Sequence, residues 1–177
     1  EQILLHDSRI QGRRQAGSAH ASTLSSGAVN PFKGLRAFYE DDAAGFFGRD
    51  RVVADVVRRL DGGAPLIGLV GPSGSGKSSI ARAGVIPALR KGAIPGSDEW
   101  VIAQMVPGAQ PLAELEAALL RSSLDAPDSL GDQLADADTG VLRAVLRVLP
   151  SENDRLVLVI DQFEELFTLV DDESRHE

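Results

Sequence analysis

The chain has 177 residues, of which 43% are hydrophobic, and it carries a formal net charge of −8. This size and composition predict an ordinary globular protein, and the acidic charge argues against direct nucleic-acid binding by this segment. The chain has no cysteine, which excludes disulfides, thiolate metal sites and cysteine nucleophiles. No apolar run reaches the length of a membrane span and no secretory pattern opens the chain, so we expect a cytoplasmic location and no membrane partner.

The N-terminal part divides by composition into two short stretches before the main domain. Residues 1–10 contain Ile3, Leu4 and Leu5, which fit the last turn of a helix, so we expect the tail of a preceding helical domain. Residues 11–30 are rich in Gly, Ala and Ser, as is typical of a flexible linker. The alternating strand and helix patterns then place the main domain at residues 31–177.

Aromatic residues gather at the start of this domain. Residues 31–47 contain four of the six phenylalanines, Phe32, Phe38, Phe46 and Phe47, which indicates a segment docked on the domain. Asp50 then opens a helical pattern of apolar residues that runs from Val52 to Leu60 and is ended by Gly62 and Gly63.

A phosphate-binding loop follows, because the segment from Gly71 to Ser78 fits G-x-x-x-x-G-K-[ST]. Its glycines let the backbone approach phosphate oxygens, and the loop amides then form an anion-binding nest. Lys77 is placed to reach the β- and γ-phosphates, and the Ser78 hydroxyl to ligate Mg²⁺. The predicted nucleotide-binding set is Gly71, Pro72, Ser73, Gly74, Ser75, Gly76, Lys77, Ser78 and Ser79.

The flanks of this loop match the strand–loop–helix order of such sites. The apolar run at 66–70 predicts a buried parallel strand before the loop, and 79–91 predicts a helix after it. Gly84 and Pro87 lie inside that helix, so we expect a kink or break near 84–87.

Further elements alternate along the rest of the chain. We expect a strand at 100–106, an amphipathic helix that includes Leu112 and Leu119, and an acidic, solvated loop at 125–138. A second helix at 141–149 and a very apolar strand at 156–160 complete the pattern. The predicted fold class is α/β, a three-layer α/β/α P-loop fold with a parallel sheet.

Acidic residues follow the last predicted strand. Asp161 comes directly after it, where a carboxylate can hold Mg²⁺ beside the phosphate loop. Gln162 stands where many ATPases carry a glutamate that polarises water, and Glu164 and Glu165 follow. The candidate catalytic residues are therefore Gln162, Glu164 and Glu165, and the sequence leaves open which of them acts.

The chain carries four motifs whose sequences and order resemble the STAND class of signalling P-loop NTPases. They are NPFKGLRAF, FFGRD, VGPSGSGKSSIARA and LVLVIDQFEELF. The resemblance is closest to the bacterial novel STAND subgroup of this class. The resemblance implies ATP and Mg²⁺ as ligands, and Gly48 and Arg49 near the nucleotide. The family core has more strands than are visible here, so we expect a domain truncated after the Asp161 strand. The first ten residues are similar to the end of a bacterial transcriptional activator domain.

These features predict a nucleotide-dependent switch in a bacterial transcription regulator, with slow ATP hydrolysis. Its expected partners are ATP or ADP, the other domains of the regulator and further copies of itself. Two alternatives stay open, a P-loop kinase acting on a small molecule and a non-catalytic module that only binds nucleotide or a protein partner. The kinase would need an Arg-rich lid, and no arginine cluster follows Asp161.

Overall fold

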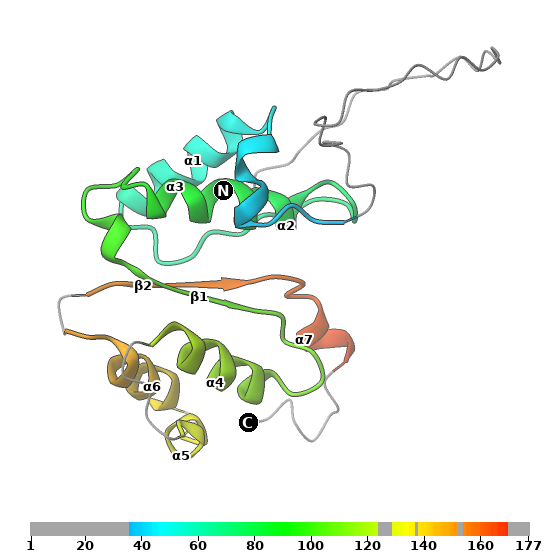
Figure 1. The fold of residues 1–177 in the computed structure, drawn as a ribbon. Coiled ribbons are helices and arrows are strands. Elements are labelled where there is room, and N and C mark those ends of the chain that lie inside the picture. The colour runs from blue at the N-terminus through cyan, green and yellow to red at the C-terminus, as the bar shows by residue number, and fades with distance from the viewer. Residues whose placement is uncertain (1–35, 124–128, 137, 152–153, 170–177) are drawn as a thin grey trace, which may run out of the picture. The chain divides into compact units, whose positions relative to one another are not determined.

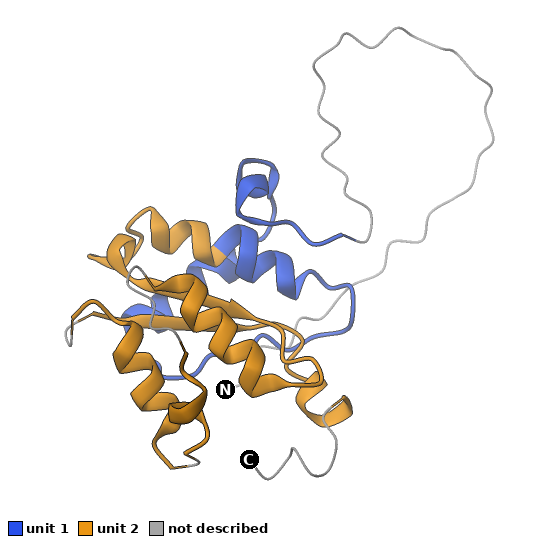
Figure 2. Cartoon of the chain, turned by 60° about the horizontal axis from the view of Figure 1, so that its bottom comes forward, with its two compact units in different colours: residues 1–84 blue, residues 85–177 orange. Residues whose placement is uncertain are grey.

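The computed structural model describes residues 36–123, 129–136, 138–151 and 154–169, so the expected tail at 1–10 and linker at 11–30 lie outside the described residues. The described chain combines helices with a two-stranded parallel sheet, a mixed α/β architecture (Figure 1). It divides into two compact units with the boundary between Gly84 and Val85 (Figure 2). Within those ranges, no helix combines the length and apolar character needed to cross a membrane.

The first unit contains the 3₁₀ helix η1 (Glu40–Gly45), the helix α1 (Asp50–Asp61) and the short helix α2 (Lys77–Ser79). The prediction for α1 is confirmed, since Asp50 lies in its first turn and Gly62 follows its last residue. Val56, Ile80 and Ala83 are the buried apolar side chains of this unit among the described residues.

The prediction of a buried strand at 66–70 is wrong. These residues belong to no strand of the described chain, and the side chains of Leu66 and Val70 are 88% and 53% exposed. An apolar run becomes a strand only where a neighbour pairs its backbone N–H and C=O groups, and the sheet of the described residues holds only two other strands. Gly68 in the middle of the run weakens its strand preference further.

The helix after the phosphate loop was predicted to kink or break near 84–87; it does not break there, but its hydrogen-bond pattern is irregular up to Val85. Helix α2 continues into the π-helical turn η2 (Ile80–Val85) and then into α3 (Ile86–Arg90) without a gap. Pro87 lies in the first turn of α3 and removes one N–H donor from the helix ladder. A change of hydrogen-bond register to the wider π turn accommodates such a site without ending the helix.

The second unit is built on the parallel pair β1 (Val101–Met105) and β2 (Leu156–Ile160). Val101 lies opposite Leu156 and Met105 opposite Ile160. Parallel pairing requires a crossover connection, and here it consists of α4 (Pro111–Ser122), α5 (Gly131–Leu134) and α6 (Gly140–Val148) (Figure 1). The predictions of both strands and of the helices α4 and α6 are confirmed.

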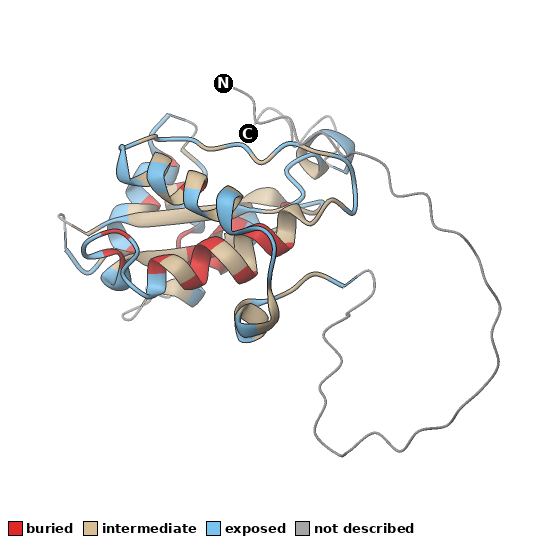
Figure 3. Ribbon diagram, turned by 90° about the horizontal axis from the view of Figure 1, so that it is seen from above, coloured by how far each residue is buried: buried red, intermediate tan, exposed pale blue. Residues whose placement is uncertain are grey.

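One core joins the sheet to these crossover helices. Ala103 and Met105 of β1 pack with buried residues of the helices and of the turn before α5, which are Leu115, Ala118, Leu119, Leu130, Leu134, Ala144 and Val148. Figure 3 shows buried residues in red, and in this view they are most frequent along the helical stretch from α2 to α3. A second group of buried residues, Ile86, Leu89 and Ile94, belongs to α3 and the turn before the 3₁₀ helix η3 (Ser97–Glu99).

The predicted acidic loop at 125–138 is only partly a loop. Among its described residues, 131–134 form α5, and both Leu130 and Leu134 are buried. The helix α6 presents its smallest residues to the interior, since Gly140 and Ala144 are buried. Its larger apolar side chains Leu142 and Leu146 are 60% and 52% exposed.

Two carboxylates hold the turns on either side of α5. Glu116 of α4 accepts hydrogen bonds from the Leu130 amide (2.7 Å) and the Ser129 hydroxyl (2.9 Å). Asp136 accepts them from the amides of Thr139 (2.9 Å) and Asp138 (3.1 Å) just before α6. These bonds favour the ionised form, so the Leu130 amide lowers the pKa of Glu116 and the Thr139 amide lowers the pKa of Asp136.

We expect Gly140→Ala to destabilise the second unit. A Cβ atom at Gly140 would lie 2.3 Å from the Gln133 carbonyl oxygen and 3.2 Å from Leu134 Cα. Overpacking of this kind costs about 1–3 kcal/mol, which exceeds the gain of up to about 1 kcal/mol in helix propensity. Denaturant unfolding followed by the fluorescence of Trp100, the single tryptophan, measures the change.

The matched control is Gly131→Ala at the start of α5. A Cβ atom there would meet no atom closer than 3.5 Å, so the free energy of unfolding should change by no more than about 0.5 kcal/mol. Equal stability of the two variants would contradict the close packing of α5 against α6.

We also expect acid to weaken the second unit through Glu116 and Asp136. Because folding lowers the pKa of both groups, their contribution is present above the unfolded values and is lost as pH falls through the folded ones. The free energy of unfolding should therefore decrease below about pH 4.5, the ordinary value for Glu116. The Glu116→Gln variant should have a shallower pH profile than the wild type, whereas Glu114→Gln on the exposed side of α4 should not. Identical profiles for the two variants would rule out the role of Glu116.

Candidate functional site

The phosphate loop lies in the first unit and contains two glycines in the left-handed conformation. Gly74 and Gly76 have φ angles of 76° and 87°, a region that other residues rarely adopt. A Cβ atom at either position would meet no atom within 4 Å, so space is open beside the loop backbone. The Ile80 amide donates to the Gly76 carbonyl (2.9 Å), which starts the helix directly after the loop.

Lys77 is held over the loop by two hydrogen bonds. Its Nζ atom donates to the carbonyl oxygens of Gly71 (2.9 Å) and Pro72 (3.0 Å). An ammonium group has three N–H donors, so this arrangement fixes the charge at the loop while one donor is not used in these two bonds. The Lys77 ammonium is therefore held at the first two residues of the loop.

The hydroxyl of Ser75 lies inside the loop without a partner. Its Oγ atom is buried and makes no hydrogen bond. A buried hydroxyl of this kind carries a desolvation cost that a bound oxygen-rich group would relieve. Together with the open space beside the glycines, this orphaned donor shows that the loop fits a phosphate group.

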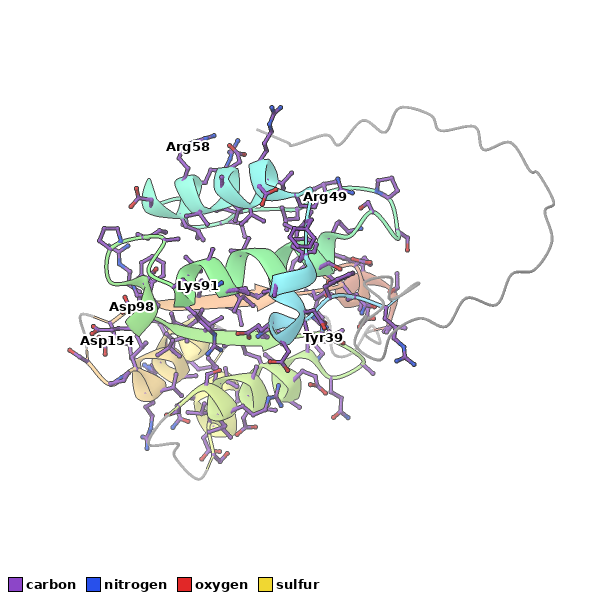
Figure 4. The ribbon with its side chains drawn as sticks, turned by 45° about the horizontal axis from the view of Figure 1, so that its top comes forward. Tyr39, Arg49, Arg58, Lys91, Asp98 and Asp154 are labelled. Atoms are coloured by element: carbon purple, nitrogen blue, oxygen red, sulfur yellow. The ribbon has the colours of Figure 1, made fainter. Side chains whose placement is uncertain are left out.

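Arg49 connects the start of α1 to the same loop. Gly48 has a φ angle of 81°, and the Val53 amide then donates to the Arg49 carbonyl (3.1 Å) to begin α1. The Arg49 side chain reaches from this end of the helix and donates from Nη2 to the Ser75 carbonyl (3.4 Å) (Figure 4). The structure therefore brings Gly48 and Arg49 together with the phosphate loop, although 26 positions separate Arg49 from Ser75.

The two serines after Lys77 differ in their surroundings. Ser78 is half-buried, whereas Ser79 is buried and its Oγ atom accepts a hydrogen bond from the Phe38 amide (3.1 Å). The aromatic segment before α1 thus contacts the phosphate-loop helix, as expected of a docked segment, although the sequence did not indicate Ser79 as the partner of Phe38.

The predicted acidic residues lie in the second unit, at the carboxyl end of β2. The Asp161 amide extends the strand pairing by donating to the Met105 carbonyl (2.9 Å), and the Asp161 carboxylate accepts from the Gln162 amide (3.0 Å). Gln162 has a φ angle of 56°, a left-handed conformation that is uncommon for a residue other than glycine. Strained residues of this kind concentrate at functional sites because the surrounding structure must hold them.

The two glutamates that follow have different contacts. Glu165 opens the short helix α7 (Glu165–Thr168), and its Oε2 atom accepts a hydrogen bond from the Gly108 amide (3.0 Å) in the loop after β1. Glu164 is exposed, and its backbone carbonyl accepts hydrogen bonds from the Phe167 amide and the Thr168 hydroxyl. Glu165 therefore ties together the loops that follow the two strands, whereas the Glu164 side chain faces solvent.

The sequence motif identified the residues of the phosphate loop, but the contact of Gly108 with Glu165 was not predicted. A glycine after the carboxyl end of a parallel strand, here with a φ angle of 59°, was the available signal. Among the described residues, no group of three or more His, Asp or Glu side chains is arranged to hold a metal. A Mg²⁺ ion needs no such cage, since it is commonly held by few protein ligands together with phosphates and water.

Comparison with known proteins gives one clear relationship. A family model described as Novel STAND NTPase 1 matches residues 31–177. Neither the comparison with curated proteins nor the comparison with solved structures gave a match. The matched range includes the aromatic segment, the phosphate loop and the acidic residues after β2.

Proposed function

Because the chain belongs to the Novel STAND NTPase 1 family, we propose that it binds ATP with Mg²⁺ and acts as a nucleotide-dependent signalling switch with slow hydrolysis. The observation that carries this proposal is the phosphate loop, with open space beside Gly74 and Gly76, an orphaned Ser75 hydroxyl and the Lys77 ammonium held across it. The family assignment supports nucleotide use, and the loop geometry supports the position of the phosphates.

In this proposal the loop from Gly71 to Lys77 surrounds the phosphates through its backbone amides. Lys77 turns its remaining donor toward the β- and γ-phosphates, and Ser75 gains a partner for its hydroxyl. Gly48 and Arg49 lie beside the same loop, so we assign them to the nucleotide as well. The absence of a side chain at Gly74 and Gly76 keeps the path to the backbone open.

In the first unit we propose Ser78 as a ligand of Mg²⁺, and in the second unit we propose Asp161. A hydroxyl after the loop lysine and a carboxylate at the end of a parallel strand are the ligand types that P-loop proteins offer to Mg²⁺. When bound, Mg²⁺ would neutralise charge on the phosphate oxygens. The residues of the chain would orient it, with the Gln162 amide fixing the Asp161 carboxylate through its hydrogen bond.

We assign the handling of water to Gln162 and Glu164, and a positioning role to Glu165. An amide such as that of Gln162 can orient water, and an exposed carboxylate such as that of Glu164 can accept its proton. Glu165 already holds the Gly108 amide (3.0 Å), so it acts by keeping the two loops together. A switch that hydrolyses slowly fits a site with glutamine in place of glutamate after the metal-binding aspartate.

The wider setting of the switch follows from the sequence likeness rather than from contacts in the fold. We propose that it works within a bacterial transcription regulator, in the cytoplasm, with ATP or ADP, the other domains of that regulator and further copies of itself as partners. The bound nucleotide would change how these parts dock on one another.

Calorimetric titration of Mg²⁺–ATP into the 177-residue chain tests the binding step. We expect binding by the wild type and loss of affinity in Lys77→Ala, because a charge-assisted hydrogen bond contributes about 1.5–3 kcal/mol, or roughly ten- to a hundredfold in Kd. The exposed Lys91 supplies the matched control, and Lys91→Ala should bind as the wild type does. Equal binding by the two variants, or none by the wild type, would refute the phosphate-loop assignment.

Phosphate release at saturating Mg²⁺–ATP tests the catalytic assignment. We expect Gln162→Ala and Glu164→Ala to lower kcat by about a hundredfold, as is typical for loss of a group that transfers or positions a proton. Affinity for Mg²⁺–ATP should change little in these two variants. Release that depends on an added small-molecule acceptor would instead favour a kinase, and binding without release in the wild type would favour a non-catalytic module.

A further inference from the structure

The buried hydroxyl of Ser79 marks a connection between the nucleotide site and the aromatic segment that precedes α1. Ser79 is 8% exposed, and its Oγ atom accepts the Phe38 amide at 3.1 Å across 41 positions of sequence. It lies directly after Lys77 and Ser78, so a displacement of that first helical turn moves the acceptor of this hydrogen bond. We call the segment Phe38–Phe46 the clip.

The clip has a second attachment one turn further along the same helix. The Arg82 guanidinium lies over the ring of Tyr39, with its central carbon 5.1 Å from the ring centroid (Figure 4 labels Tyr39). Positions three residues apart on a helix share a face, so Ser79 and Arg82 both present to the clip. A cation over an aromatic face attracts it independently of the backbone hydrogen bond.

The third attachment closes the far end of the clip. A Cβ atom at Gly84 would lie 3.3 Å from Phe46 Cε1 and 2.5 Å from Val53 Cγ2, so the helix backbone approaches these side chains closely. The Phe38 and Phe46 rings contact each other with centroids 5.7 Å apart. The clip is therefore attached to one short helical stretch at its start, through Phe38 and Tyr39, and at its end, through Phe46.

That stretch is the irregular part of the helix. Arg82 and Gly84 lie within the π turn Ile80–Val85, and Ser79 immediately precedes it. A π turn is a local departure from the regular α-helical ladder and is common at functional sites.

We propose that the clip is the element through which the nucleotide site acts on the rest of the chain, with nucleotide binding and clip docking strengthening each other. This inference rests on the proposed ATP binding and names how that site is coupled. Lys77 and Ser78 fix the first helical turn when they hold nucleotide and metal. Ser79 then stays in place as the acceptor for Phe38, and the clip is held more firmly. Linkage requires the reverse effect, so a loosened clip weakens nucleotide binding.

Amide hydrogen exchange resolved at the clip tests this coupling. The reporters are the amides of Phe38, Asp42 and Phe46, which donate to Ser79, Tyr39 and Ala43 respectively. Saturating Mg²⁺–ATP should slow their exchange at least about fivefold in the wild type, the lower end of the usual range of allosteric coupling. The Lys77→Ala variant, at the same nucleotide concentration, should show no such change.

Variants at Tyr39 separate coupling from simple packing. Tyr39→Leu removes the aromatic face that Arg82 covers, whereas Tyr39→Phe keeps it. We expect Tyr39→Leu to speed amide exchange in the clip and to reduce the change in exchange that nucleotide causes. The same variant should weaken Mg²⁺–ATP binding by no more than about threefold. Tyr39→Phe should behave as the wild type does. A purely structural role would not make exchange depend on nucleotide.

The outcomes distinguish this inference from the proposed function. A chain that binds Mg²⁺–ATP in calorimetry but shows unchanged clip exchange would overturn the coupling and leave nucleotide binding intact. A wild-type chain that binds no Mg²⁺–ATP would overturn both. Should Tyr39→Leu fail to fold, Arg82→Gln removes the same contact from the helix side and should give the same loss of response.

Discussion

Parallel pairing of β1 with β2 is the constraint on which the second unit depends. Parallel strands cannot be joined by a tight turn, so the chain must cross over between Met105 and Leu156, and α4, α5 and α6 cover one face of the sheet as it does so. The same pairing places the carboxyl ends of both strands at one edge. That is why Gly108 and Glu165, which are far apart in sequence, are close enough to share a hydrogen bond.

The first unit depends instead on close approach of backbone segments. Left-handed glycines shape the loop, and Gly84 lets the following helix approach Val53 and Phe46. Side chains then join the segments across the approach, with Arg49 on the loop carbonyl and Ser79 on the clip amide. The loop at residues 71–78 and the helix that follows it are therefore contacted by residues that precede them in the chain, Arg49 and Phe38.

The sequence predicted the elements whose side-chain period is strong. The helix from Asp50, both strands and the helices α4 and α6 were identified because apolar residues recur at helical spacing or form short uninterrupted runs. The apolar run at 66–70 has the same pattern, but the strand predicted from it is not formed. Strand formation depends on pairing with a neighbouring strand, and an apolar run does not specify that neighbour. The helix α5 was missed because only Leu130 and Leu134 interrupt an acidic stretch, too few residues to show a period.

Some features of the candidate site could likewise be predicted from the sequence, and others could not. The loop is a local motif, so its residues could be named from spacing alone. The choice between Glu164 and Glu165 could not be made, since it depends on where α7 begins and on Gly108, a partner 57 positions away. The left-handed conformation of Gln162 could not be predicted either, because glutamine has no preference for that conformation. Non-local contacts and strain are the parts that only three-dimensional packing decides.

The outward face of α6 has a consequence for how the chain behaves in concentrated solution. Leu142 and Leu146 are exposed there, and Arg143 and Arg147 alternate with them on the same helix. Charged residues between apolar ones disfavour association of this surface with the same surface of another copy, as gatekeeper residues that flank aggregation-prone segments do. That protection is electrostatic, so it weakens as ionic strength shortens the Debye length. Association of copies through this helix face should thus become easier as the salt concentration rises.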